Sequence, residues 1–211
     1  MTKIQLENVT KRFKEHTVVD SVSMELVSGS VTGLKGINGS GKTMLMRLMC
    51  GLILPTEGRI MINGKEIGKD MDFPDNLGLL IENPAFLDNY SGFANLKMLA
   101  EIRNIITDEN IREVISRVGL DPDDKKKYKK YSLGMKQRLG IAGAIMEQPD
   151  ILLLDEPTNA LDTKGVEMLK NIVQEEKKRG ALIVLTCHDA EILEEMADEI
   201  YFMENGRIIN A

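Results

Sequence analysis

The chain of 211 residues contains no tryptophan, few other aromatic residues and only two cysteines. Cys50 and Cys187 have neither the spacing of a metal site nor that of a redox pair, which excludes a zinc or dithiol motif built on them. We expect two reduced thiols in apolar surroundings. Methionine is frequent where aromatics are scarce, and we expect Met44, Met46 and Met49 to pack in an adaptable core rather than to form a ligand set.

Long apolar runs and an excess of positive charge are also missing. The two longest runs, Met44 to Leu54 and Ala181 to Cys187, are too short to span a bilayer, and Arg47 interrupts the first. The opening M-T-K-I-Q-L-E-N lacks the charged and then apolar layout of a signal peptide, so we expect a cytosolic chain. The formal net charge of −6 disfavours nucleic acid as the main partner but leaves room for a local basic patch.

One motif predicts the first ligand. Gly36 to Thr43 read G-I-N-G-S-G-K-T, the G-x-x-x-x-G-K-[ST] pattern of a phosphate-binding P-loop. Bare glycines let consecutive backbone N–H groups surround a triphosphate, and the helix that follows points its positive end at the same place. Lys42 is expected to reach the β- and γ-phosphates, and Thr43 to hold Mg²⁺ through its hydroxyl. The alternative is a Gly-rich turn before a helix, but the pattern arises by accident in roughly 1% of chains this long.

Hydrophobic periodicity predicts an α/β fold around this loop. Alternation of apolar and polar residues near the N-terminus indicates an antiparallel β layer, and Asn63-Gly64 is typical of a hairpin turn. Continuous apolar runs separated by helical stretches indicate a parallel sheet covered on both faces. Strands are expected at 30–35, 77–81, 151–154 and 182–186, with a final pair of strands at 199–203 and 207–209. Helices are expected at 43–50 and 164–179. With 211 residues and 43% hydrophobic content, the chain can bury one core, or a core with a subdomain.

The middle third has a different character. From Gly92 to about Met146 apolar residues recur at helical spacing, which predicts an inserted helical segment. Within it, Asp121 to Lys130 read D-P-D-D-K-K-K-Y-K-K, either a solvated linker or a basic docking segment.

A P-loop by itself also suits a small-molecule kinase or a GTPase, and the second half of the chain narrows the choice. Asp155 and Glu156 follow the apolar run 151–154, so Asp155 is placed to meet Mg²⁺ while Glu156 polarises an attacking water. The alternative is that both carboxylates cap the turn before Pro157. His188 ends the next strand, where it acts as a γ-phosphate sensor or, alternatively, as a hydrogen-bonded packing residue.

A second anion site is expected at Ser132. This serine is placed to cap a helix, and a helix N-terminus with a hydroxyl and the N–H of Gly134 binds anions. A chain with two triphosphate-type sites has a reason to dimerise.

Taken in order, these segments resemble the ATP-binding cassette of ABC transporters over essentially the whole chain. The resemblance implies a P-loop NTPase (RecA-like) parallel-sheet core with an N-terminal antiparallel β layer and an inserted α-helical subdomain, as a single domain over 1–211. Its core is expected at 1–84 and 147–211, and its helical subdomain at about 85–146.

The resemblance also implies roles for individual residues. Glu156 matches the catalytic glutamate, His188 the switch histidine and Asp162, in N-A-L-D, the D-loop. Thr43 and Asp155 would hold Mg²⁺, and Ser132 and Gly134 would touch the γ-phosphate held by a second cassette. The residues expected to bind ATP are Phe13, which would stack on adenine from ahead of the first strand pair, and Asn38, Gly39, Ser40, Gly41, Lys42, Thr43 and Met44.

Two positions depart from the family pattern. Glu82, in I-E-N-P, stands where most cassettes have the glutamine of the Q-loop, and its carboxylate is expected either to bind Mg²⁺ directly or to face solvent from a loop. The signature usually written L-S-G-G-Q keeps only Ser132 and Gly134, and the bulky Leu133 narrows the approach of the backbone to phosphate. Both departures resemble the bacitracin-resistance and lantibiotic-immunity branch of the family.

This resemblance implies an ATPase subunit that binds ATP and Mg²⁺ and forms an ATP-dependent homodimer. The subunit would power a separate integral-membrane permease that exports a peptide antibiotic or another drug- or lipid-like substrate. It would be cytoplasmic and peripheral on the inner face of the membrane, bound through the permease near the segment after Glu82, with no nucleic acid. The alternatives are an ABC importer subunit, a soluble ABC-type ATPase that acts on ribosomes or DNA, and a nucleotide-binding regulator without turnover.

Overall fold

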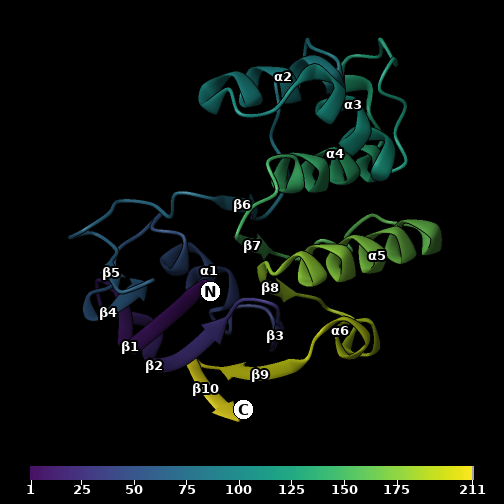
Figure 1. Ribbon diagram of the computed structural model, residues 1–211. Helices are drawn as coiled ribbons and strands as arrows, with labels where there is room; N and C mark the ends of the chain where they lie inside the picture. Colours follow the sequence, from purple (N-terminus) through teal and green to yellow (C-terminus); the bar gives the residue numbers. More distant parts are fainter. Residues whose placement is uncertain (211) are drawn as a thin grey trace.

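A six-stranded sheet forms the centre of the molecule in the computed structural model, which describes residues 1–210 (Figure 1). The strand order is β10-β9-β3-β8-β7-β6, and every neighbouring pair is parallel except β9 with β10. Its strands are β3 (Val31–Lys35), β6 (Leu77–Leu80), β7 (Ile151–Leu154), β8 (Leu182–Thr186), β9 (Glu199–Glu204) and β10 (Arg207–Asn210). The predicted parallel sheet is confirmed.

The continuous apolar strands of this sheet feed two separate hydrophobic cores. In β7, Ile151 and Leu153 pack into one core while Leu152 and Leu154 pack into the other. Strand β8 divides its side chains in the same way. Because successive side chains of a strand point to opposite faces, a strand covered on both sides has to be apolar at every position.

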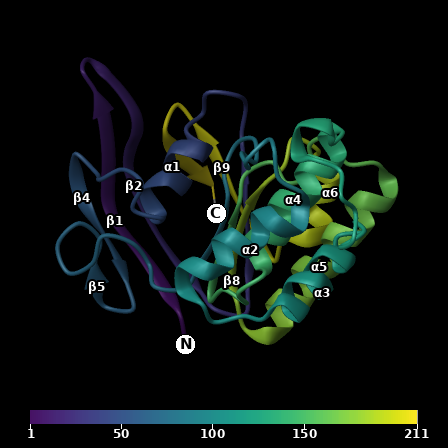
Figure 2. The ribbon, with the colours of Figure 1, turned by 90° about the horizontal axis from the view of Figure 1, so that it is seen from above.

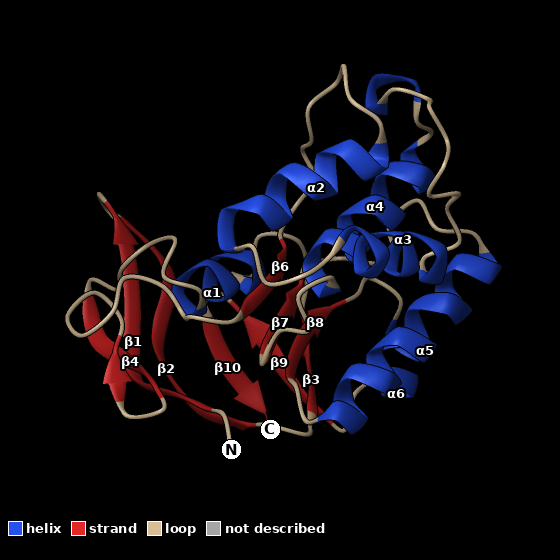
Figure 3. Ribbon diagram, turned by 45° about the horizontal axis from the view of Figure 1, so that its top comes forward, coloured by secondary structure: helices blue, strands red, loops and turns tan. Residues whose placement is uncertain are grey.

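An antiparallel sheet with the order β2-β1-β4-β5 packs over one face of the central sheet. Its strands are β1 (Lys3–Phe13), β2 (His16–Val27), β4 (Glu57–Ile62) and β5 (Lys65–Glu66). Helix α1 (Lys42–Met49) lies between the two sheets (Figures 2 and 3). Its Leu45, Met46, Leu48 and Met49 are fully buried in the core that the two sheets share. The predicted N-terminal β layer and methionine-containing core are therefore present.

One boundary in this layer differs from expectation. Phe13 does not precede the first strand pair but is the last residue of β1, where it pairs with His16 across a tight turn. Lys14 in that turn has a left-handed backbone with φ of 52°. The strand extends further than the apolar alternation indicates, because residues 11–13 have polar or exposed side chains yet keep the ladder.

The middle third of the chain forms a block of helices beyond β6 and β7 (Figure 1). It consists of α2 (Gly92–Arg103), α3 (Asp108–Arg117), a short 3₁₀ helix (Tyr128–Lys130) and α4 (Leu133–Ile145). Ser91 and Ser132 cap α2 and α4, and Thr107 forms a capping box with Asn110 at α3, so each of these helix starts has a side-chain acceptor for a free backbone N–H. The division into a core and a helical subdomain at 85–146 stays a prediction, since one hydrophobic cluster joins α2–α4 to β7 and β8.

Two helices cover the remaining face of the central sheet. They are α5 (Thr163–Arg179) and α6 (Ala190–Met196). Periodicity predicted α5 but not α6, a helix of seven residues in which only Leu193 and Met196 are buried. Among residues 1–210, none of the helices combines the length and the apolar character that crossing a bilayer requires.

Candidate active site

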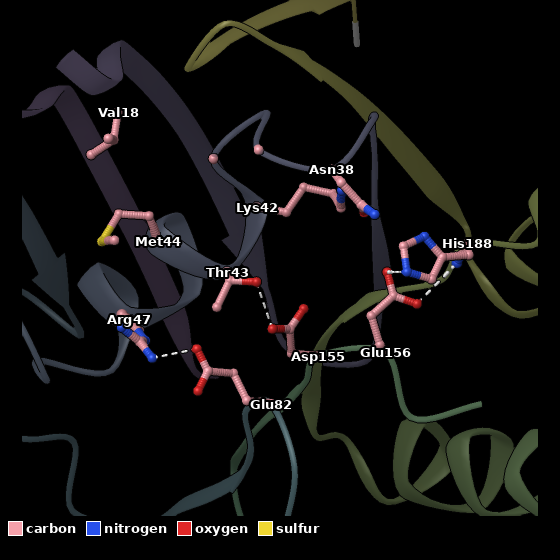
Figure 4. Close-up of a pocket in the computed structure, with 12 residues that line it drawn as sticks. Val18, Asn38, Lys42, Thr43, Met44, Arg47, Glu82, Asp155, Glu156 and His188 are labelled. Carbon is pink, nitrogen blue, oxygen red and sulfur yellow. Dashed lines mark hydrogen bonds and ion pairs between the residues drawn. The ribbon is translucent and has the colours of Figure 1, made fainter. Parts of the chain in front are cut away.

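A cavity of about 360 Å³ lies where β3, β7 and β8 end and α1 begins (Figure 4). Ten of the residues singled out from the sequence lie around it together, and Val18 and Arg47 join them unpredicted. The cavity is lined by Val18, Asn38, Gly39, Gly41, Lys42, Thr43, Met44, Arg47, Glu82, Asp155, Glu156 and His188. In an α/β sheet the carboxyl ends of parallel strands are the usual place for a ligand.

The P-loop connects β3 to α1 in the conformation that the motif requires. Gly41, directly before α1, has a φ of 109°, and a Cβ there would lie 2.6 Å from the carbonyl oxygen of Val18, so only glycine fits. Lys42 is almost fully buried, and its Nζ donates to the carbonyl oxygens of Gly36 at 2.7 Å and Ile37 at 3.1 Å. The ammonium group is therefore held inside the loop by neutral acceptors, with its full charge available to an anion.

Ser40 adds a buried polar atom without a partner. Its side chain is buried, and its Oγ makes no hydrogen bond within the described part of the chain. A buried hydroxyl without a partner is costly. Ser40 does not line the cavity, so the fit of the loop to a nucleoside triphosphate rests on the buried Lys42 ammonium and the glycines beside it.

The two residues predicted to hold Mg²⁺ are in contact with each other. The Thr43 hydroxyl donates to Asp155 Oδ2 at 2.6 Å, and the buried Thr186 hydroxyl donates to Asp155 Oδ1 at 2.8 Å (Figure 4). A hydroxyl and a carboxylate are the hard oxygen donors that Mg²⁺ prefers. Residues 1–210 contain no cluster of three or more His, Cys, Asp or Glu side chains suited to a metal. The Thr43 and Asp155 oxygens fit Mg²⁺, which would take its remaining ligands from phosphate and water.

Glu156 lies beside this pair and faces His188. Its backbone N–H donates to the Thr186 hydroxyl at 2.7 Å, and its φ of 50° is a left-handed conformation that is rare outside glycine. Its Oε2 accepts from the backbone N–H of His188 at 3.0 Å, and its Oε1 lies 3.5 Å from His188 Nε2 (Figure 4). The Glu156 side chain is 15% exposed and that of His188 is 54% exposed.

The charge state of Glu156 is shifted by its surroundings. Burial raises the pKa of its carboxyl above the ordinary value, against the opposing effect of the His188 side chain. Its Oε1 is buried and makes no hydrogen bond among the described residues. A carboxylate with one free oxygen and a raised pKa is suited to accept a proton from water.

Two side chains that sequence reasoning missed hold this strand end in place. Thr186 bridges Asp155 and the backbone of Glu156, as described above. Gln137, buried in α4, donates from Nε2 to the carbonyl oxygens of Glu156 at 3.2 Å and Pro157 at 3.1 Å. A threonine at the end of a strand and a glutamine within a helix give no separate signal in the sequence.

Glu82 lies at the far edge of the cavity, and it is paired with a cation. Its Oε1 accepts from Arg47 Nη2 at 2.6 Å (Figure 4). Glu82 has a φ of 57°, and it follows β6 in the same way that Glu156 follows β7. The sequence offered a metal ligand or a solvent-facing loop residue, and the pairing with Arg47 is a third arrangement.

Phe13 does not line the cavity. Its ring is half exposed at the end of β1, and the Lys11 Nζ lies 5.1 Å from the ring centroid. Val18 on β2 takes a place in the cavity wall. Adenine stacking by Phe13 stays a prediction.

The signature and D-loop residues lie outside the cavity as well. Ser132 Oγ accepts from the backbone N–H of Met135 at 3.2 Å, and Asp162 caps α5 while accepting from Arg138 Nη2 at 2.9 Å. A Cβ on Gly134 would lie 2.8 Å from the carbonyl oxygen of Ala160, so α4 and the D-loop are in close contact. These residues do not line the cavity of their own chain, which is consistent with a role toward a second molecule.

Comparison with known proteins identifies the family. Residues 19–159 match the ABC transporter family model. An uncharacterised ABC transporter ATP-binding protein of Bacillus subtilis (strain 168) is 51% identical over 97% of this chain and 94% of its own length. A bacitracin transport ATP-binding protein of Enterococcus faecalis is 36% identical over 98% of this chain and 68% of its own length.

A solved structure agrees with the fold. The dimeric bacterial ABC transporter cassette MJ0796 superposes with a TM-score of 0.89 at 22% identity, over 98% of this chain and 97% of that one. The predicted family and the P-loop NTPase fold are confirmed. The chain belongs to the ABC transporter family, as one of its ATP-binding subunits.

Proposed function

We propose that this chain hydrolyses ATP with Glu156 as the base and His188 beside it, and that it thereby powers export of a peptide antibiotic, or of a drug- or lipid-like substrate, through a separate permease. The observation that carries the proposal is the position of Glu156. Its Oε1 is buried in the cavity wall without a hydrogen bond, next to the Thr43–Asp155 pair and 3.5 Å from His188 Nε2. A regulator that only binds nucleotide has no need of this arrangement.

The side chains of the site have separate roles in ATP hydrolysis. Lys42 and the P-loop N–H groups bind the β- and γ-phosphates, while Thr43 and Asp155 hold Mg²⁺. Bound Mg²⁺ offsets phosphate charge and fixes the phosphate geometry. Glu156 orients a water and accepts its proton, and His188 donates to the γ-phosphate or to that water.

The second half of each site comes from another subunit. ABC cassettes of transporters work as dimers, and we propose a homodimer in which Ser132 and Gly134 of one copy approach the γ-phosphate held by the other. Ser132 is the N-cap of α4, so in this dimer the positive end of that helix points at the shared phosphate. Leu133 is 75% exposed next to it, on the side that faces a second copy in this arrangement. Loss of the γ-phosphate then weakens the closed dimer.

An apolar groove supports the place proposed for the permease. A cavity of about 590 Å³ lies between α1, the segment after β6 and helices α2 and α4. It is lined mainly by apolar residues, among them Leu52, Pro84, Phe86 and Leu99. We propose that a segment of the permease docks there, which places the chain on the cytoplasmic face of the membrane. The helical subdomain at about 85–146 would then form one wall and the core at 1–84 and 147–211 the other.

Two experiments in the source organism test this function. Affinity purification of the tagged chain from detergent-solubilised membranes is expected to recover a multi-span membrane protein, and recovery of ribosomes or DNA would contradict transport. Deletion of the gene is expected to raise sensitivity to bacitracin or to a lantibiotic, with rescue by the parent and not by Glu156→Gln. Unchanged sensitivity to both would overturn the export of these peptide antibiotics while leaving the ATPase in place.

A further inference from the structure

The Arg47–Glu82 ion pair lies on the border between the two cavities. Both residues line the nucleotide cavity and also the apolar groove. Arg47 belongs to α1 and Glu82 to the segment after β6, so the pair connects the P-loop helix to the chain that leads into the groove. None of the roles described above uses Arg47.

The helix places Arg47 next to the metal position. Thr43 and Arg47 are four residues apart in α1, and residues at this spacing lie on the same face of a helix. The carboxylate that Arg47 holds therefore lies near the Thr43–Asp155 pair, as the close-up of the cavity shows (Figure 4).

The charges in the cavity indicate that Arg47 compensates the negative charge of Glu82. Three carboxylates line it, those of Glu82, Asp155 and Glu156, against the cations of Lys42 and Arg47. Asp155 is held by two hydroxyl donors and Glu156 by a backbone N–H with the His188 ring beside it, whereas Glu82 pairs with the charged guanidinium of Arg47. A glutamate without that charge would repel a triphosphate, which a neutral glutamine does not.

A divalent cation can replace Arg47 as the partner of Glu82, because the ion pair is exposed to water. The Glu82 side chain is 61% exposed and that of Arg47 is 33% exposed. Ion pairs this open to water are weak, and a divalent cation carries twice the charge of a guanidinium.

We propose that Arg47 is a positioning residue that holds and neutralises Glu82 until a divalent metal replaces it. In the metal-free protein the guanidinium keeps the carboxylate from repelling the phosphates. When metal binds with nucleotide, Glu82 moves from Arg47 to the metal or to its water shell. The inference rests on the proposed ATP site, and it assigns a function to a residue outside the P-loop motif.

A double-mutant cycle tests the inference. The proteins are the parent, Arg47→Met, Glu82→Gln and the double variant, and the measurement is binding of ATP in EDTA at low salt. Arg47→Met is expected to weaken metal-free ATP binding about three- to fivefold, because it leaves Glu82 uncompensated. In the Glu82→Gln background the same change is expected to have less than about a twofold effect. Arg47→Lys keeps the charge and is expected to restore most of the affinity.

A second readout uses Mn²⁺, followed by electron paramagnetic resonance in the presence of ATP. Arg47→Met is expected to tighten Mn²⁺ binding about two- to fivefold, because the metal no longer competes with a guanidinium for Glu82. This gain should vanish in the double variant.

Arg112→Met is the matched control. Arg112 pairs with Asp123 at 2.6 Å with similar exposure, but it lies in α3 and does not line either cavity. This variant should bind ATP and Mn²⁺ as the parent does, and thermal unfolding checks that every variant folds.

The outcomes separate the inference from the proposed function. Equal losses from Arg47→Met with and without Glu82 would mean that Arg47 contacts phosphate directly, and would overturn the inference. Unchanged metal-free binding in Arg47→Met would overturn it too, with the ATP site intact. A parent protein that binds no ATP, with or without Mn²⁺, would overturn the proposed function and this inference with it.

Discussion

The Thr43 hydroxyl donates a 2.6 Å hydrogen bond to Asp155 Oδ2 although 112 positions separate the two residues in the chain. The contact joins the first turn of α1 to the end of β7, at the position proposed for the metal. It also leaves Asp155 with both oxygens engaged, since Thr186 holds the other.

Thr43→Val is expected to reduce Mg²⁺-dependent ATP hydrolysis about a hundredfold, because it removes one oxygen donor from the metal and one restraint on Asp155. Steady-state hydrolysis over a range of Mg²⁺ concentrations checks this. Thr10→Val is the control, since the buried Thr10 hydroxyl accepts from Ser21 N–H away from the cavity. Hydrolysis by Thr43→Val at the parent rate and the parent Mg²⁺ requirement would refute the metal assignment.

His188→Ala is expected to lower kcat about a hundredfold with little change in ATP binding. The backbone N–H of His188 still donates to Glu156 Oε2 in this variant, so the loss is that of the imidazole alone. Single-turnover kinetics together with nucleotide titration separate the two effects. The other histidine, exposed His16 on β2, serves as the control for kcat. A His188→Ala protein that turns over normally would leave the histidine a packing role.

Leu133→Gly restores a glycine of the usual signature, and we expect it to strengthen ATP-dependent dimerisation about fivefold. The reason is steric, because Leu133 is the first residue of α4 and its exposed side chain separates the backbone from the partner's phosphate. Sedimentation in the Glu156→Gln background, with ATP, measures the dimer. Leu133→Ala should give an intermediate result, and a weaker dimer in both variants would show that Leu133 itself makes a favourable contact.

The raised pKa of Glu156 predicts a pH-dependent stability difference. The pKa of this carboxyl is raised from its ordinary value of 4.5 in the folded state. At pH values between the ordinary and the raised pKa, the folded protein therefore binds more protons at Glu156 than the unfolded chain does. The contribution of Glu156 to the free energy of unfolding is therefore highest below its ordinary pKa, and it falls as the pH rises through the raised pKa. Glu156→Gln removes this penalty, so without nucleotide it should be more stable than the parent at pH 7 and lose that advantage as pH falls toward 4.5.

Urea unfolding across this pH range tests the difference, with exposed Glu113→Gln as the control. A Glu156→Gln protein less stable than the parent at pH 7 would show that the carboxylate is better satisfied than its free Oε1 indicates.

The sequence predicted those parts of the fold that hydrophobic pattern controls directly. Strands β7 and β8 are apolar at every position because both faces are covered, and such runs are visible without a structure. Helix α6 escaped detection because seven residues with two buried side chains leave too little periodicity. The end of β1 escaped it because backbone pairing, rather than burial, carries the strand to Phe13.

The residues of the site also fall into those that the sequence predicted and those that it did not. Motifs predicted the P-loop, Asp155, Glu156 and His188 as site residues, and the structure places them around one cavity. The Arg47–Glu82 pair was not predictable, because the residues are 35 positions apart and meet only through the packing of α1 against the segment after β6. Gln137 was missed for a similar reason, since it holds the backbone of Glu156 from a helix of another segment.

The central claim, that Glu156 is the base of an ATPase, is tested most directly by the turnover of Glu156→Gln. We expect its kcat for ATP to fall about a hundred- to a thousandfold while ATP binding and the fold are retained, because the amide cannot accept a proton from water. Hydrolysis of ATP by Glu156→Gln at the rate of the parent would contradict the claim.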